Sequence, residues 1–115
     1  MSGDRDIAPA GGNDDREETA VAALRLLGLA RRSGRLEVGF SAVERLALRH
    51  SDAVVMVTLD MGASQRRRLE NWQVKKVVTL PLTSERLGSA MGREKVAITG
   101  LRDAGFIKGL EKLGL

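Results

Sequence analysis

Three short apolar runs rich in β-branched residues constrain this sequence more than any other feature. AVVMVTL (53–59), KVVTL (76–80) and KVAIT (95–99) each have the length of a strand. The first run is apolar at almost every position, and continuous apolar character predicts a strand that is buried on both faces. We therefore predict that 53–59 is the central strand, that 76–80 is a second buried strand, and that 95–99 is the final strand.

Segments with helical periodicity alternate with these runs. Asp14 with Glu17, and Ser41 with Glu44, have the spacing of capping boxes, and Ser84 is a further candidate cap. We expect a brief strand at 36–39 and helices at about 15–32, 41–50, 63–72, 84–92 and 103–113. This order of elements predicts an α/β fold in which helices cover both faces of a small sheet.

A chain of 115 residues suits one domain. Residues 1–13 are rich in Gly, Asp and Ala and show no periodicity, so we expect a disordered acidic leader, followed by a single domain at 14–115. The sequence has no cysteine, which excludes disulfides and thiolate metal sites and favours a cytoplasmic location. Neither a signal peptide nor a membrane span is expected, and no membrane partner.

Charge is distributed unevenly along the chain. Residues 1–18 hold six acids against two arginines, so the net charge of +4 divides into −4 there and +8 over residues 19–115. A body this basic attracts polyanions, of which nucleic acid, an anionic membrane and an acidic protein are the first candidates. Phe40, Trp72 and Phe106 are the only aromatic residues, too few for a surface that stacks successive bases. Any RNA binding should therefore depend on shape and phosphate contacts.

Catalytic chemistry has little support in the residue inventory. The chain has one histidine, His50, which we expect to be structural or exposed at the end of a helix. Asp60 follows the central strand, where a phospho-acceptor or Mg²⁺ role is conceivable, but a turn residue or cap is the better interpretation. The segment GLARRSGRLEVG (28–39) matches neither a Walker motif nor GxGxxG. We expect no enzyme, cofactor or metal site.

The start of the second helix is the best candidate for an anion site. Free N–H groups near Gly39, Phe40 and Ser41 would favour a phosphate, with Arg45 one turn further along. The loop at 93–95 could join this site from another strand–helix junction, and plain helix capping is the alternative. Arginines also flank the end of the first helix, whereas the run at 66–68 is more typical of a solvated face.

At these positions the sequence resembles a known family. LLGLARRSGRLEVGFSAVERL (26–46), VVMVTLD (54–60) and ERLGSAMGREKVAIT (85–99) look like the bacterial YlxQ-like branch of the ribosomal L-seven-Ae and L-thirty-e superfamily. The resemblance covers about residues 20–108. It implies a three-layer α-β-α sandwich with a four-stranded mixed sheet, and binding of kink-turn RNA.

The resemblance also implies which residues bind RNA. Kink-turn binders of this family carry Gly-x-Asn-Glu-x-x-Lys at the start of the second helix, where this chain has Gly39, Ser41, Ala42 and Arg45. Arg45 keeps the cation, but Ala42 cannot accept a hydrogen bond as Glu does. Together with the basic segments, the pattern gives these candidate RNA-binding residues: Arg32, Arg35, Gly39, Phe40, Ser41, Ala42, Arg45, Arg93, Glu94 and Lys95.

Two functions from different classes follow. The first is a non-catalytic protein of the ribosome or another ribonucleoprotein that binds structured, kink-turn-like RNA, with no DNA specificity. The second is a protein-interaction adaptor on the same fold, which has lost selective RNA binding and whose basic face meets an acidic partner. The departure at Ala42 favours the adaptor.

Overall fold

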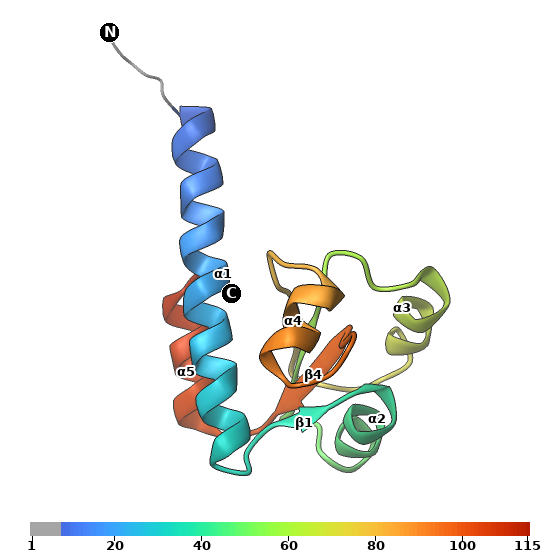
Figure 1. Cartoon of the computed structure of the whole chain (residues 1–115). Helices are drawn as coiled ribbons and strands as arrows, with labels where there is room; N and C mark the ends of the chain where they lie inside the picture. Colours follow the sequence, from blue (N-terminus) through green and yellow to red (C-terminus); the bar gives the residue numbers. More distant parts are fainter. Residues whose placement is uncertain (1–7) are drawn as a thin grey trace, which may run out of the picture.

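A computed structural model describes residues 8–115 of the chain (Figure 1). The elements are α1 (Ala8–Arg32), β1 (Glu37–Val38), α2 (Phe40–Arg49), β2 (Val54–Val57), α3 (Ala63–Leu69), β3 (Lys76–Thr79), α4 (Ser84–Ala90), β4 (Ile98–Leu101) and α5 (Ala104–Lys112). Among the helices of this described part, none is both long and apolar enough to cross a membrane.

The four strands form one mixed sheet in the order β1-β4-β2-β3. β2 and β3 are parallel, and β4 runs antiparallel to both β1 and β2. In this pairing, the last residues of β1, β2 and β3 lie at the same end of the strands as the first residue of β4. The element order and the mixed sheet expected from the sequence are therefore confirmed.

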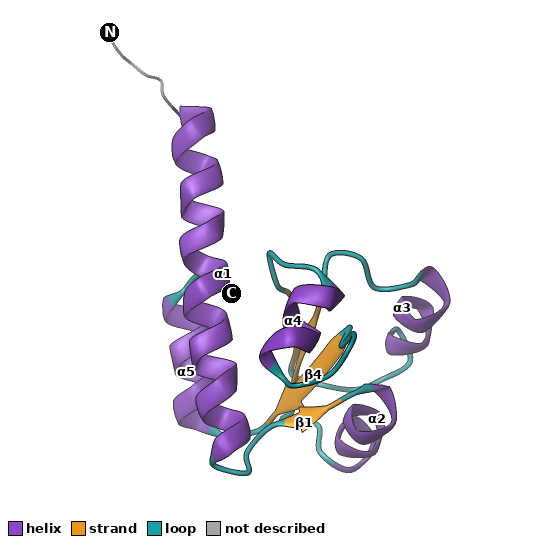
Figure 2. Ribbon diagram, viewed as in Figure 1, coloured by secondary structure: helices purple, strands orange, loops and turns teal. Residues whose placement is uncertain are grey.

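Helices cover both faces of the sheet, as the sequence predicted (Figure 2). We call face A the side that packs against α1, α4 and α5, and face B the side that packs against α2 and α3. Successive residues of β2 alternate between them: Val54 and Met56 lie in the core of face A, and Val55 and Val57 in that of face B. All four are buried, which confirms β2 as an inner strand.

α1 begins at Ala8, earlier than the start expected near residue 15. Pro9 is compatible with this start because a first-turn residue has no intrahelical partner for its N–H. Asp14 consequently lies inside the helix and does not cap it, so that predicted capping box is wrong. Residues 1–7 of the expected leader lie outside the described residues, and the domain boundary at 13/14 stays a prediction. Figure 1 shows the first turns of α1 extending beyond the rest of the fold.

Two strands differ from the prediction. β4 begins at Ile98, not at Lys95, because the residues before it pack against α4: the Val96 N–H donates to the Ser84 carbonyl at 2.9 Å. β3 is an edge strand and only Val78 of its residues is buried, so the prediction of a second fully buried strand is wrong. A continuous apolar run does not reveal which strand ends up at the edge of a sheet.

Candidate functional site

α2 begins directly after β1 ends, at the end of the sheet where β2 and β3 also end. Gly39 precedes the helix with a φ of 93°, a left-handed conformation that favours glycine. No side chain caps this end, so the predicted capping box of Ser41 and Glu44 is wrong; Ser41 is exposed in the first turn. An uncapped helix start presents backbone N–H groups and a partial positive charge, which suits an anion.

Arg93 reaches the same place from the loop between α4 and β4. Its Nη1 lies 3.3 Å from the position that a Cβ on Gly39 would occupy. The guanidinium therefore lies against the backbone at the helix start, and glycine leaves the space for it. Although Gly39 and Arg93 are far apart in the sequence, the fold brings these two predicted site residues close together.

The loop that carries Arg93 is held by backbone contacts to α4. The Arg93 N–H donates to the Gly88 carbonyl at 2.8 Å. A Cβ on Gly88 would lie 2.7 Å from the Glu94 carbonyl oxygen, so the loop packs directly on the helix backbone. The loop thus has a defined position relative to the sheet, which fixes where Arg93 leaves the backbone.

Cations outnumber acids in this region, where Glu94 lies between Arg93 and Lys95 in the sequence. Arg45, Arg93 and Lys95 are exposed, and no carboxylate of the described residues forms an ion pair with them. Glu44 on the same helix accepts from Arg68 Nη2 at 3.0 Å, so its charge is already compensated. The result is a net positive surface around an uncapped helix start.

Phe40 has a packing role in addition to its place at the helix start. Its ring lies 5.3 Å from that of Trp72, centroid to centroid, and the Arg68 guanidinium lies 4.3 Å above it. These contacts attach the first turn of α2 to α3. Phe40 is half-buried.

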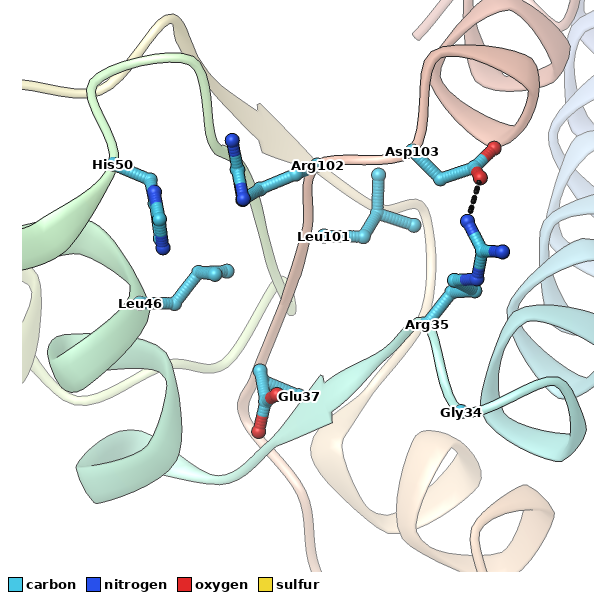
Figure 3. Close-up of a pocket in the computed structure, with 8 residues that line it drawn as sticks. All are labelled: Gly34, Arg35, Glu37, Leu46, His50, Leu101, Arg102 and Asp103. Atoms are coloured by element: carbon cyan, nitrogen blue, oxygen red, sulfur yellow. Dashed lines mark hydrogen bonds and ion pairs between the residues drawn. The ribbon is translucent and has the colours of Figure 1, made fainter.

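The remaining candidates divide between two places. Ala42 is half-buried on α2, the helix that also carries Arg45. Glu94 is exposed in the loop that carries Arg93, which lies close to Gly39. Arg32 and Arg35 instead lie at the end of α1, before β1. Arg35 Nη1 donates to Asp103 Oδ2 at 2.7 Å, a contact drawn in Figure 3. The structure thus joins most of the predicted residues and leaves these two arginines apart.

Asp60 connects the end of β2 to α4. Its carboxylate accepts hydrogen bonds from the Ser84 N–H and the Ser84 hydroxyl, both at 2.8 Å. These bonds hold the pKa of Asp60 below its usual value. The carboxylate therefore acts as a local hydrogen-bond acceptor, which agrees with the turn or cap interpretation. Among the described residues, no three His, Asp or Glu side chains are grouped as metal ligands.

Three contacts of the arginine run at 66–68 were missed in the sequence. Arg68, assigned to a solvated face, packs on Phe40 and pairs with Glu44, and Arg66 donates to the Thr58 carbonyl at 3.4 Å. A run of three arginines carries no local signal of such contacts. His50 caps α2 through its backbone N–H, which donates to the Leu46 carbonyl at 2.9 Å.

Comparison with known proteins identifies the fold. No family model matches the sequence. No curated protein sequence matches it significantly either. A solved structure of a protein of unknown function from Bacillus halodurans C is 27% identical, with a TM-score of 0.66 over 79% of this chain and 94% of that one. The 15.5kD RNA-binding protein of Giardia lamblia is 14% identical, with a TM-score of 0.63 over 84% of each chain, and so shares the fold.

Proposed function

We propose that this chain is an RNA-binding protein whose contact surface is the start of α2 together with the Arg93 loop. The observation that carries the proposal is the close approach of the Arg93 guanidinium to Gly39, beside an uncapped helix start. Backbone N–H groups and guanidinium groups are the donors that RNA phosphates accept from. The Giardia protein of the same fold, named as RNA-binding, supports the proposal.

The finer features of the proposal rest on the resemblance stated above. We propose structured, kink-turn-like RNA as the partner, association with ribosomes, a cytoplasmic location and no catalytic activity. Shape and phosphate recognition fits the described surface, because Phe40 packs against Trp72 and is not free to stack on a base. Because the side chain of Ala42 cannot accept a hydrogen bond, any selectivity for one RNA shape would come from backbone N–H groups and arginines.

The proposal is tested by titrating the protein with a kink-turn RNA and a matched straight duplex at two salt concentrations. We expect salt-dependent binding, tighter for the kink-turn RNA. Arg93→Ala should lower the affinity about tenfold, or about 1.4 kcal/mol, and Arg45→Glu by more, because it also introduces repulsion of the phosphates.

Lys112→Ala is the matched control, because Lys112 is an exposed cation at the end of α5, far from α2 (Figure 1). It should leave binding nearly unchanged. Absence of salt-dependent affinity for either RNA would contradict RNA binding. Equal affinity for the two RNAs would retain RNA binding and remove kink-turn selectivity.

A protein-interaction adaptor is the second candidate, favoured by Ala42, which offers no side-chain acceptor at the start of α2. In this case the uncompensated cations around Gly39 would meet acidic side chains of a partner. Purification of the tagged protein from cells with and without ribonuclease separates the two functions. An adaptor retains its partners after digestion, whereas an RNA-binding protein loses those held through RNA.

A further inference from the structure

A groove follows α2 from its first turns to its end. One cavity of ≈ 450 Å³ lies between the end of α2 and the junction of β4 with α5 (Figure 3). A second cavity, of ≈ 180 Å³, adjoins it along α2, and both are lined by Glu37, Leu46 and His50. The shared lining makes the two cavities neighbours along one helix, and we call them together the α2 groove.

The α2 groove is continuous with the surface proposed above to bind RNA. Ala42 and Arg45 line its nearer cavity and also belong to the candidate site at the start of α2. Ten helical residues advance by about 15 Å, so a strand that leaves Gly39 along α2 passes several phosphates over the groove. The occupant is therefore most simply a continuation of the same RNA.

Arginines outnumber acids on the walls of the groove, where Arg35, Arg45, Arg49 and Arg102 lie with Glu37 and Asp103. Arg45 and Arg49 are exposed one turn apart on α2, and neither forms an ion pair with a carboxylate of the described residues. Two like charges at this spacing repel each other in the free helix. An anion held between them would relieve that repulsion.

The far end of the groove holds arginines in defined positions. Arg102 is fixed by Asp52, which accepts from its Nε at 3.0 Å and its Nη2 at 3.2 Å. This arrangement leaves Nη1 of Arg102 available as a donor. In Figure 3, Arg102 and His50 lie on the same side of the cavity, and Leu46 and Leu101 form apolar parts of its lining.

We propose that the α2 groove binds the phosphate backbone of the RNA stem that flanks the site at Gly39, with Arg49 and Arg102 as contacts. This inference rests on the proposed function and adds a second contact region to it. It predicts that RNA affinity depends on the length of the flanking stem. The two regions should be separable by mutation, because Arg93 and Arg49 lie at opposite ends of the path.

The test uses two kink-turn RNAs, one whose flank ends close to the kink and one whose flank is about ten base pairs longer. Wild-type protein should bind the longer RNA more tightly and with a steeper salt dependence. Arg49→Ala should lower affinity for the longer RNA about fivefold, reduce the salt slope by about 1, and leave the shorter RNA unaffected. Arg93→Ala should weaken both, and Lys112→Ala neither.

Three outcomes would overturn the inference. If Arg93→Ala weakens binding while Arg49→Ala leaves the longer RNA unchanged, the groove is not a contact region and the proposed function stands. If wild-type protein binds neither RNA, both fail. If adenosine monophosphate shifts the NMR signals of Leu46 and His50 saturably and the longer RNA does not compete, the groove is a small-molecule pocket.

Discussion

The two faces of the sheet differ in how much apolar surface they bury. Among the described residues, face A has sixteen buried residues in its core and face B has six. α1 and α5 pack side by side on face A, whereas α2 and α3 on face B are joined by Phe40, Trp72 and Arg68. Burial of apolar area is the main favourable term in folding, so face A should supply most of the stability.

The candidate site lies where the two faces meet. Gly39 and Arg45 belong to the α2 layer on face B, while Arg93 comes from a loop held by α4 on face A. Face A, with the larger core, thus positions Arg93. Face B, with the smaller core, presents Gly39 and Arg45, and Arg45 forms no ion pair with a carboxylate of the described residues. Mutations on the two faces can therefore test the stability of the fold and the binding of RNA separately.

The largest expected effect comes from the same substitution made in each core. Leu27 on α1 is fully buried, and Leu27→Ala should cost about 4 kcal/mol, near the upper part of the range for such cavities. Leu69 on α3 lies in the smaller core, whose surroundings can relax, so Leu69→Ala should cost about 2 kcal/mol. Urea unfolding measures both free energies. Equal losses would show that the faces contribute alike.

Part of this contrast could be predicted from the sequence. The buried strand 53–59 and the order of elements follow from continuous apolar runs and helical periodicity, which are local patterns. The exposure of Val77 could not, because the position of a strand in the sheet depends on its neighbours. The start of β4 was misplaced because packing of Val96 against α4 is a tertiary contact.

The candidate site shows the same division. Gly39 and Arg45 were identified from the residues expected at a helix start, and the structure places Arg93 beside Gly39. The pairing of Arg68 with Phe40 and Glu44 joins α3 to α2 and leaves no signature in a run of three arginines. The ion pair of Arg35 with Asp103 could not be predicted either, because the two residues are distant in the sequence.

A smaller effect tests whether face A positions the loop at the site. A Cβ on Gly88 would meet the Glu94 carbonyl at 2.7 Å, and backbone cannot yield as a side chain does. Overpacking costs about 1–3 kcal/mol and exceeds the helical gain of alanine, so Gly88→Ala should lose about 1 kcal/mol net. It should also weaken RNA binding, because the Arg93 loop is displaced.

Gly28→Ala is the matched control, since Gly28 is also helical and its added Cβ would meet only Arg32 Nη1, at 3.7 Å. This substitution should stabilise the protein by up to about 1 kcal/mol and leave RNA binding unchanged. Thermal unfolding and RNA titration of both variants give the comparison. Unchanged RNA affinity in Gly88→Ala would show that the loop position does not matter for binding.

The smallest expected effect depends on pH and concerns Asp60, which links β2 to α4. Its pKa is lowered in the folded protein by the Ser84 N–H and hydroxyl, and the unfolded chain lacks these bonds. The carboxylate therefore adds stability above its unfolded pKa of 3.8, and this contribution is lost as pH falls through the lower folded value. Asp60→Asn should lower Tm at neutral pH.

The difference in Tm between wild type and Asp60→Asn should begin to shrink as the pH falls below about 4, because the unfolded chain then binds a proton at Asp60 that the folded protein takes up only at lower pH. Glu70→Gln serves as the control, since Glu70 is exposed and its side chain forms no hydrogen bond within the described chain. A Tm difference that persists unchanged into acid would mean that the charge of Asp60 is irrelevant. The loss would then come from replacing one acceptor oxygen with an NH2 group, because Ser84 donates to both oxygens of the aspartate.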